Sequence, residues 1–391
     1  MSSHIMSTYG RLPVSFSHGK GAWLWDKNNE RYLDAISGIG VCNLGHAHPA
    51  VHSAICKQSE KLIHTSNLYN IELQEQLAQK LCELSKLQSV FFCNSGAEAN
   101  EAAIKIARHY GHSQGILEPT IIVMEKSFHG RTMATLSATG NSKIKNGFEP
   151  LLQGFVHVPF NDIPAIESAI QKNQNIVAIL VEPIQGEGGV NIPADDYLNK
   201  IRAICDQHQL LMMLDEVQTG IGRTGKFFAF QHNNIIPDIC TLAKALGNGV
   251  PIGACLASGE AAKTLTAGTH GSTFGGNLLA CSAAIAVLNE LENQNLVDQA
   301  INKGALICNQ LAEKLQQNTQ VKNIRHKGMM IAIELSAPCT ELAQQALLQN
   351  LLINVTSENV IRLLPPLVIT QEQIEFLVNT LVELVTEYTK Q

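Results

Sequence analysis

The chain has 391 residues, a length that predicts two or three domains and a sizeable buried core. Its 28 basic and 34 acidic residues leave a net charge of −6, and 16% of all residues are charged against 45% that are hydrophobic. This balance excludes a disordered chain, and without a basic surplus we expect no nucleic-acid partner. The longest apolar runs fall far short of the roughly 18 residues of a membrane span, which excludes an integral membrane protein.

Apolar stretches of strand length alternate with helical stretches through the middle of the chain. Strands are expected at 89–93, 120–124, 155–159, 177–181, 210–214, 238–242 and 252–257. Helices are expected at 97–110, at 163–172, and after Pro193, where Asp195 and Asp196 suit a first turn. Strands separated by helices predict a mostly parallel sheet covered on both faces, and therefore a large doubly wound α/β domain.

The pattern changes after Asn277. Long helices are expected at 278–291 and 295–317, followed by short strands at 329–335 and 361–364. These elements predict a smaller α+β domain that the N-terminal segment completes. The expected division is therefore 1–50 for the joining segment, 51–277 for the large domain and 278–391 for the small one.

The spacing of the cysteines indicates the cellular compartment of the protein. There are ten, they are scattered along the chain, and no two form a Cys-x-x-Cys pair. Disulfide frameworks belong to short secreted chains, whereas scattered thiols among apolar neighbours behave as small hydrophobic residues. No signal-peptide pattern is visible at the N-terminus, so we expect a cytoplasmic protein.

The segment Asn94–Asn100 lies where a strand becomes a helix. Free backbone N–H groups at a helix start, next to the Ser95 hydroxyl and the small Gly96, are suited to bind an anion. The alternative is an ordinary helix cap formed by Asn94 or Ser95.

Two further glycine- or histidine-containing motifs are misleading. Gly220–Gly225 matches G-x-G-x-x-G, but a dinucleotide site needs these glycines directly between a strand and a helix, and an apolar stretch from Lys226 follows here. We therefore favour a structured turn over a nicotinamide-dependent dehydrogenase. His46 and His48 are close together, but no third ligand lies nearby, so we expect no metal site.

Polar residues follow two of the expected strands. Asp215 and Gln218 come after 210–214, at the edge where open parallel sheets bind ligands. Lys244 follows 238–242 among small residues; a lysine there is either solvated on a loop or a neutral nucleophile with a lowered pKa.

Two more motifs supply groups for a flat anionic ligand. After 120–124, Phe128 could stack on a ring and Arg131 could bind a carboxylate, or both could belong to a plain turn. Ser272 and Thr273 offer hydroxyls in a glycine-rich loop. An anion site, an aromatic face, an acid and an isolated lysine at strand ends together match the needs of pyridoxal 5'-phosphate (PLP).

At this point the chain resembles a known family, the class III (ornithine-type) aminotransferases of PLP-dependent transferase fold type I. The resemblance extends from about residue 19 to about 370. The segments that carry it are 32–35, 44–49, 94–101, 127–132, 181–187, 214–220, 242–247, 270–276 and 362–366. Asn248, where the family often has Gly, and Leu278, where Pro is common, depart from the pattern.

The resemblance implies the roles of the site residues. Lys244 is expected to form the Schiff base with the cofactor, Asp215 to pair with the ring nitrogen, Gln218 to lie near the ring hydroxyl and Phe128 to stack on the ring. Ser95, Gly96 and Ala97 are expected to hold the phosphate. Arg131 and Arg362 match the substrate carboxylate clamps, Glu187 matches the carboxylate that covers Arg362, and Ser272 is placed with the substrate. Thr273 is expected to reach the neighbouring subunit's site in a homodimer.

The same resemblance implies the reaction. The stretches 19–49 and 220–253 favour transfer of the δ-amino group of N2-acetylornithine to 2-oxoglutarate, a step of arginine biosynthesis that proceeds by a ping-pong cycle. Ornithine, succinylornithine, succinyldiaminopimelate and 4-aminobutyrate remain alternative amino donors, since pocket lining decides among them. The sequence also leaves open an aminomutase and a PLP-binding module without turnover.

Overall fold

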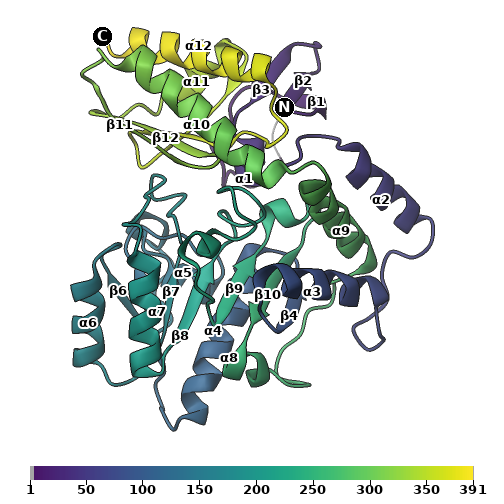
Figure 1. Ribbon diagram of the computed structural model, residues 1–391, viewed down its shortest axis with the longest axis vertical. Helices are drawn as coiled ribbons and strands as arrows, with labels where there is room; N and C mark the ends of the chain where they lie inside the picture. The colour runs from purple at the N-terminus through teal and green to yellow at the C-terminus, as the bar shows by residue number, and fades with distance from the viewer. Residues whose placement is uncertain (1–3, 391) are drawn as a thin grey trace.

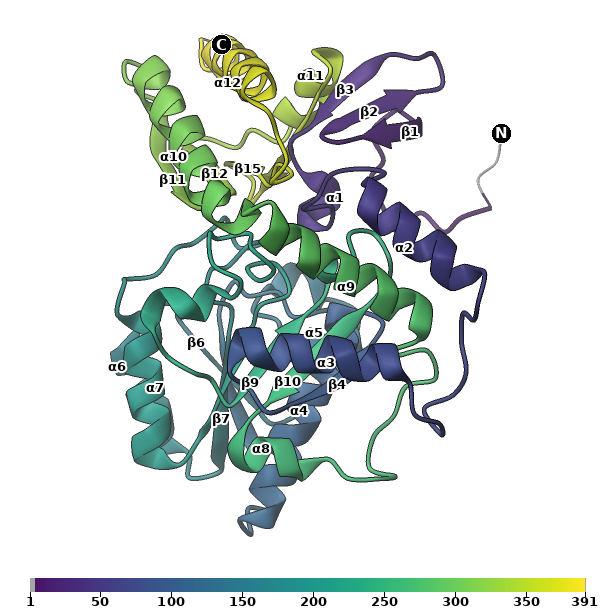
Figure 2. The ribbon, with the colours of Figure 1, turned by 45° about the vertical axis from the view of Figure 1, so that its right-hand side comes forward.

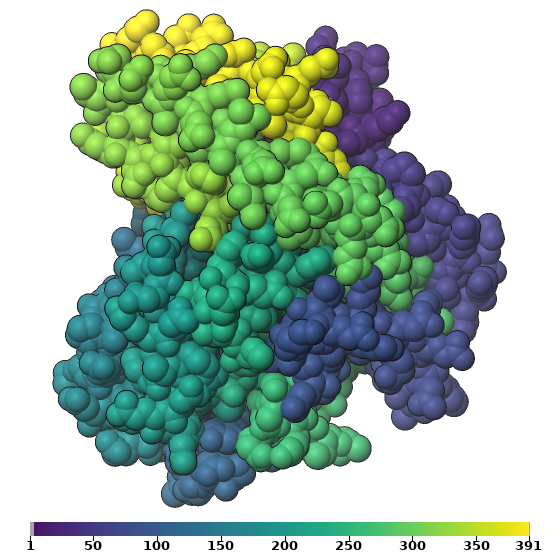
Figure 3. Space-filling model, in the orientation of Figure 1, coloured from purple at the N-terminus to yellow at the C-terminus, as the bar shows by residue number. Residues whose placement is uncertain are grey.

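The computed structural model describes residues 4–390, which form two stacked parts (Figures 1 and 3). The larger part is a seven-stranded sheet with helices on both faces, and the smaller part holds two four-stranded sheets. Residues 1–3 and Gln391, which the expected ranges 1–50 and 278–391 include, lie outside the described residues. Within residues 4–390, every helix is too short or too polar to cross a membrane.

The large sheet has the strand order β4-β10-β9-β8-β7-β5-β6. Its strands are β4 (Ser89–Cys93), β5 (Thr120–Met124), β6 (Phe155–Val158), β7 (Ile176–Val181), β8 (Leu211–Asp215), β9 (Ile239–Leu242) and β10 (Gly253–Ala257). β10 runs antiparallel to β4 and β9, and the other neighbouring pairs are parallel. The predicted mostly parallel α/β sheet is confirmed. β10 is reversed because its connection from β9 contains a single 3-10 turn, too short for a parallel crossover.

Both faces of this sheet are buried. Ile121 and Val123 of β5 belong to the same core cluster as Ile104 of α4, whereas Ile122 belongs to the cluster that holds Ile201 of α7. This alternation follows from the two-residue period of a strand. The elements around the sheet are α3 (Glu72–Ser85), α4 (Gly96–Ser113), α5 (Met133–Ala138), α6 (Ile163–Lys172), α7 (Tyr197–His208), α8 (Gly259–Thr264) and the 3-10 helices Ser142–Ile144, Ala229–Asn233 and Lys244–Leu246.

The smaller part combines the two ends of the chain. One sheet has the order β1-β2-β3-β13 and the other β11-β12-β15-β14. The strands are β1 (Phe16–Lys20), β2 (Trp23–Asp26), β3 (Arg31–Asp34), β11 (Val321–Lys327), β12 (Met330–Leu335), β13 (Leu351–Leu352), β14 (Asn354–Thr356) and β15 (Val360–Leu363). Figure 2 shows the N-terminal strands beside α11 and α12, and β3 pairs in parallel with β13. The domain boundaries at 50 and 277 stay a prediction.

The remaining helices connect or cover the small sheets. They are α1 (Ser37–Gly40), α2 (Pro49–Ser59), α9 (Leu278–Asn293), α10 (Leu296–Leu315), α11 (Leu342–Leu348) and α12 (Gln371–Tyr388). The helices that go beyond the elements predicted from the sequence are α1, α2, α3, α5, α8, α11 and α12. The helix expected at 97–110 extends over 96–113. Asn248, a departure from the family pattern, has a φ of 45° and bonds with both Leu44 N–H (2.9 Å) and the Gly45 carbonyl (3.0 Å).

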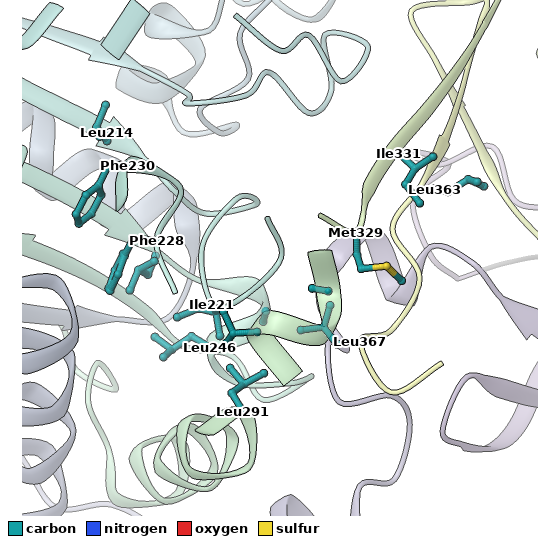
Figure 4. Close-up of a cluster of buried hydrophobic side chains, with 14 of the residues drawn as sticks. Leu214, Ile221, Phe228, Phe230, Leu246, Leu291, Met329, Ile331, Leu363 and Leu367 are labelled. Carbon is teal, nitrogen blue, oxygen red and sulfur yellow. The ribbon is translucent and has the colours of Figure 1, made fainter. Parts of the chain in front are cut away.

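One hydrophobic core runs through both parts. The close-up in Figure 4 follows buried side chains from the end of the large sheet to the small one. All ten labelled residues belong to a single cluster: Leu214, Ile221, Phe228, Phe230, Leu246, Leu291, Met329, Ile331, Leu363 and Leu367. Continuous apolar packing of this kind fixes the position of β15 relative to the ends of β8 and β9.

Candidate active site

A cavity of about 400 Å³ lies at the carboxyl ends of the large sheet's parallel strands. Loops that follow β4, β5, β7, β8 and β9 contribute to its lining, as the strand-end rule for open α/β sheets predicts. The cavity brings together most of the predicted site residues, namely Ser95, Gly96, Ala97, Phe128, Arg131, Glu187, Asp215, Gln218 and Lys244. Arg362, Ser272 and Thr273 lie outside this lining.

Lys244 begins a 3-10 turn directly after β9 and projects into the cavity. Its φ of 44° lies in the left-handed region, which a residue with a side chain adopts only when its surroundings hold it there. Burial lowers the pKa of Lys244, and Arg362 lowers it further, while Glu187 and Asp215 act in the opposite direction. The neutral amine is therefore easier to form here than on a solvated lysine.

Asp215 ends β8 and is buried. Its Oδ2 lies 2.8 Å from His129 Nδ1 and accepts a 2.8 Å hydrogen bond from Asn100 Nδ2. Its Oδ1 accepts a bond of 3.0 Å from the Val217 N–H. These three contacts fix the direction of the carboxylate.

Sequence reasoning missed the groups that hold Asp215. Asn100 also donates to the His129 carbonyl (2.8 Å) and accepts from Thr241 Oγ1 (2.7 Å), so α4, β8 and β9 meet at one hydrogen-bond network. The signal was present in the sequence, because Asn100 is a polar residue on the otherwise alanine-rich buried face of α4. Buried amides of this kind require partners.

The N-terminus of α4 forms one end of the cavity. Ser95 caps the helix and accepts a hydrogen bond of 3.2 Å from the Glu98 N–H. A Cβ on Gly96 would lie 2.7 Å from Val217 Cγ1, so only glycine fits between the helix start and the loop after β8. The first N–H groups of α4 have no acceptor inside the helix and are suited to bind a phosphate.

Gln218 is held against the loop after β7. A Cβ on Gly186 would lie 2.0 Å from Gln218 Oε1, so glycine leaves the space that this side chain fills. Among residues 4–390, Gln218 Oε1 is one of a few buried side-chain atoms without a hydrogen-bond partner. A buried acceptor that lines a cavity indicates that a ligand supplies the missing donor.

Arg362 and Glu187 form an ion pair beside the cavity. Arg362 Nη1 lies 2.6 Å from Glu187 Oε1, and Arg362 also donates to Asn354 Oδ1 from Nε (3.1 Å) and Nη2 (2.6 Å). Burial alone would raise the pKa of Glu187, but the Arg362 charge outweighs it and the pKa is lowered. Arg362 is only 1% exposed, so this carboxylate compensates a buried cation.

Arg131 offers a second, more accessible guanidinium. It is exposed, lines the cavity, and lies 5.7 Å from the centroid of the Phe128 ring. The Phe128 N–H donates to Glu182 Oε2 at 3.1 Å, which fixes the loop that carries both residues. Sequence reasoning missed Glu182. Burial and the nearby Asp215 raise its pKa well above the usual value for a carboxyl group.

The loop with Ser272 and Thr273 lies at the surface. Ser272 Oγ accepts from Asn94 Nδ2 (3.2 Å) and from the Gly275 N–H (3.0 Å), so it stabilises a turn next to the start of α4. Thr273 is exposed and does not belong to the lining of the cavity. This placement is compatible with the expected role in a neighbouring subunit and does not test it.

The two misleading motifs have other partners. Gly220–Gly225 forms turns, with no helix at its end, and Arg223 within it is fully buried. His46 Nε2 lies 2.8 Å from Asp34 Oδ2, and His48 Nδ1 accepts a bond from the Ala50 N–H that opens α2. Residues 4–390 contain no group of three or more His, Cys, Asp or Glu side chains arranged to hold a metal.

The donors and acceptors of the cavity fit PLP. Helix α4 presents N–H groups to a phosphate, Asp215 presents a carboxylate to a protonated ring nitrogen, and the unpartnered Gln218 Oε1 can accept from the ring hydroxyl. Lys244 supplies the amine that such a cofactor requires. The fit rests on the unpartnered Gln218 acceptor and on the free N–H groups at the start of α4.

Comparisons with known proteins agree with this fit. The family described as aminotransferase class-III matches residues 5–385. An acetylornithine aminotransferase from Nitrosomonas europaea is 57% identical over 98% of each chain. A Toxoplasma gondii ornithine aminotransferase with partial PLP occupancy at its active site has a TM-score of 0.95 and 34% identity, over 99% of this chain and 93% of its own. An acetylornithine aminotransferase from Elizabethkingia anophelis has a TM-score of 0.88 and 35% identity, over 98% and 96%.

Proposed function

Because the chain belongs to the class III aminotransferases, PLP-dependent enzymes of fold type I, we propose that it transfers the δ-amino group of N2-acetylornithine to 2-oxoglutarate. The products are the corresponding semialdehyde and glutamate. The Glu187–Arg362 ion pair beside Lys244 is the observation that carries the proposal. The pair gives the cavity two states. When Glu187 is displaced, Arg362 can bind a carboxylate on the reacting carbon of the substrate. When Glu187 stays on Arg362, the cavity accepts a reacting carbon that carries no carboxylate.

When bound, PLP supplies an electron sink for the negative charge that develops when the C–H bond next to the amine breaks. Asp215 would maintain this property as the carboxylate that pairs with the ring nitrogen. A carboxylate about 4 Å from a ring cation contributes about 4 kcal/mol at an effective dielectric of about 20. That energy corresponds to about three pKa units, enough to keep the ring nitrogen protonated at neutral pH.

Lys244 moves the proton. Its burial lowers the pKa of the amine, so the neutral form is available to take a proton from the reacting carbon as a general base. The same group then returns the proton as a general acid. Phe128 would cover one face of the cofactor ring, and Ser95, Gly96 and Ala97 would hold the phosphate at the start of α4.

The two arginines orient both substrates. Glutamate carries carboxylates at both ends, so it binds Arg131 with one and Arg362 with the other, and displaces Glu187. The δ-carbon of N2-acetylornithine carries no carboxylate, so Glu187 stays on Arg362 while the α-carboxylate binds Arg131. Alternation between these states is what a ping-pong transfer between unlike substrates requires. Ser272 contributes by fixing the loop beside the cavity.

We also infer a homodimer and a cytoplasmic location. Asn67 Nδ2 donates to the carbonyls of Ser272 (3.0 Å) and Gly275 (3.1 Å), so the 62–69 loop and the Thr273 loop form one surface. Leu68 is 87% exposed and Phe274 59% exposed on that surface, which suits burial against a second copy. In that dimer Thr273 serves the neighbouring active site. Free cysteines throughout residues 4–390 support a reducing compartment.

Ranking amino donors with 2-oxoglutarate as acceptor tests the function. The panel contains N2-acetylornithine, N2-succinylornithine, ornithine, succinyldiaminopimelate and 4-aminobutyrate, each measured as kcat/KM for glutamate formation. N2-acetylornithine is expected to give the highest value. A different donor with a kcat/KM about tenfold higher would replace the proposed substrate. Conversion of the amino donor to an isomer that keeps the amino group, without glutamate formation, would favour an aminomutase.

A further inference from the structure

A second cavity of about 680 Å³ opens beside the one that holds Lys244. The two share Phe128, Arg131 and Glu187, so a substrate bound at Arg131 extends from one into the other. We call it the outer cavity. Its rim is formed by the segment 140–144 on one side and by the turn 356–360 between β14 and β15 on the other.

Most charged groups around the outer cavity are already paired. Arg325 Nη1 lies 2.5 Å from Glu334 Oε2, and Arg325 also donates to the Gly189 (2.6 Å) and Val190 (2.9 Å) carbonyls. Each of the three guanidinium nitrogens is therefore engaged, which holds Arg325 in place and excludes it as a flexible anchor for substrate.

Two cations on the wall differ from Arg325. Of the ion pairs formed within residues 4–390, none includes Arg131 or Lys126. The wall therefore has a surplus of positive charge, which suits a substrate end with one or more carboxylates.

The rim itself is closed by an ion pair between Lys143 and Glu358. Lys143 comes from the 3-10 helix Ser142–Ile144 of the larger part, and Glu358 from the β14–β15 turn of the smaller part. The two side chains are 78% and 60% exposed. Exposed pairs contribute little to stability, so another carboxylate can replace Glu358 on Lys143 at small cost.

The turn that places Glu358 at the rim has a backbone conformation that residues with side chains rarely adopt. Ser357 has a φ of 50° and Glu358 a φ of 69°, two successive left-handed residues that are not glycine. Side chains at such positions are disfavoured and persist where the surroundings hold them. A 2.8 Å hydrogen bond from the Cys339 N–H to the Glu358 carbonyl does so here.

We propose that the outer cavity binds the acylamino end of the amino donor and that the Lys143–Glu358 pair at its rim selects the acyl group. This inference rests on the proposed function. A neutral acetyl group fits inside the cavity and leaves the pair intact. A succinyl group extends further and ends in a carboxylate, which binds Lys143 only after displacing Glu358. The pair therefore favours short neutral acyl groups over longer anionic ones.

The test is the ratio of kcat/KM for N2-succinylornithine to that for N2-acetylornithine, measured on purified holoenzyme. Glu358→Gln removes the competing carboxylate and is expected to raise this ratio about fivefold. Lys143→Met is expected to lower the ratio in the Glu358→Gln background and to leave the acetyl donor within about twofold. Raising the salt to about 1 M shortens the Debye length to about 3 Å and should remove the gain of Glu358→Gln.

A matched control separates this effect from a general change of surface charge. Lys200 forms an exposed ion pair with Asp196 on α7, away from both cavities, so Lys200→Met should leave the ratio unchanged. Turnover of both donors with the same ratio in wild type, in Glu358→Gln and in the double variant with Lys143→Met overturns this inference alone. If wild type uses neither donor, the proposed function is wrong, and the inference, which rests on it, is wrong as well.

Discussion

Glu187→Gln is the substitution that most directly tests how one cavity accepts two unlike amino donors. In the structure Glu187 compensates Arg362, which is 1% exposed and whose other side-chain partner, Asn354, is neutral. The variant keeps an acceptor oxygen and loses the charge. N2-acetylornithine needs Glu187 to stay on Arg362, whereas glutamate displaces it, so the two donors should respond differently.

The size of the effect follows from the contact. A hydrogen bond to a charged group contributes about 1.5–3 kcal/mol, against about 1 kcal/mol for a neutral one. Glu187 is 35% exposed, so solvent screening places the loss at the low end, about 1.5 kcal/mol or about tenfold in kcat/KM. The N2-acetylornithine reaction should therefore fall about tenfold, while the glutamate reaction stays constant or improves because no carboxylate needs to be displaced.

The assay measures the two half-reactions separately, in single turnovers followed by the absorbance of the bound cofactor. Glu292→Gln is the control, since Glu292 pairs with Lys80 on the exposed side of α9. Both half-reactions should be unchanged in that variant. Equal losses in the two half-reactions of Glu187→Gln would refute the alternating pair, because a carboxylate that is present in both states cannot discriminate between donors.

Three further predictions concern the amine, the subunit contact and pH. Lys244→Ala should abolish transamination without changing the circular dichroism spectrum, and borohydride reduction of wild type should attach the cofactor to Lys244; a label on another lysine contradicts the assignment. Thr273→Ala should lose activity and regain it when mixed with Lys244→Ala, since the mixed dimer has one complete site; no recovery on mixing excludes the shared site. Burial lowers the pKa of His46, but the hydrogen bond to Asp34 outweighs it and raises the pKa to about 9. This raised pKa stabilises the fold fully below about pH 6.5, and the contribution is lost as pH rises through about 9, by at most about 3 kcal/mol. The difference in urea midpoint between wild type and His46→Gln should therefore shrink from pH 6.5 to 9, and a constant difference contradicts the linkage.

The positions of Lys244 and Asp215 could be predicted because the chemistry follows local patterns. Asp215 is the last residue of the apolar strand β8, Lys244 follows the apolar strand β9 after Ala243, and the two strands are neighbours in the sheet, with Asp215 opposite Thr241. Parallel neighbours end at the same edge, so two residues that are far apart in the chain reach one cavity. The same reasoning placed Phe128 and the start of α4 correctly.

Pairs that depend on packing between the two parts could not be predicted from patterns. Glu187 and Arg362 are 175 residues apart, and their contact requires β15 to lie against the loop after β7. Resemblance to the family suggested the pair, whereas spacing gave no sign of it. Asn100 and His129 were missed for a related reason, because their polar atoms acquire a role only once α4, β5 and β8 meet around Asp215.

Arg223 shows most clearly why sequence patterns fail at this junction. It lies in a glycine-rich turn that suggests a solvated loop, yet it is fully buried. Its guanidinium donates to Ser37 and Asn43 of the N-terminal segment and to the carbonyls of Met329 (3.2 Å) and Pro365 (2.5 Å). The surface that covers it is formed by segments from both ends of the chain.

These bonds connect the two halves of the site. Arg223 follows Gln218 by one short turn, and Pro365 follows Arg362 within the same segment, so one side chain links the loop that carries Gln218 to the segment that carries Arg362. Burial lowers the pKa of Arg223 to about 9, although Asp34 counteracts this, and the cation is kept by neutral acceptors. A buried donor with several acceptors is costly to rearrange. The proposed exchange of Glu187 therefore takes place at an Arg362 whose segment these bonds hold against the large part, so the exchange requires no movement of the small part relative to the large sheet.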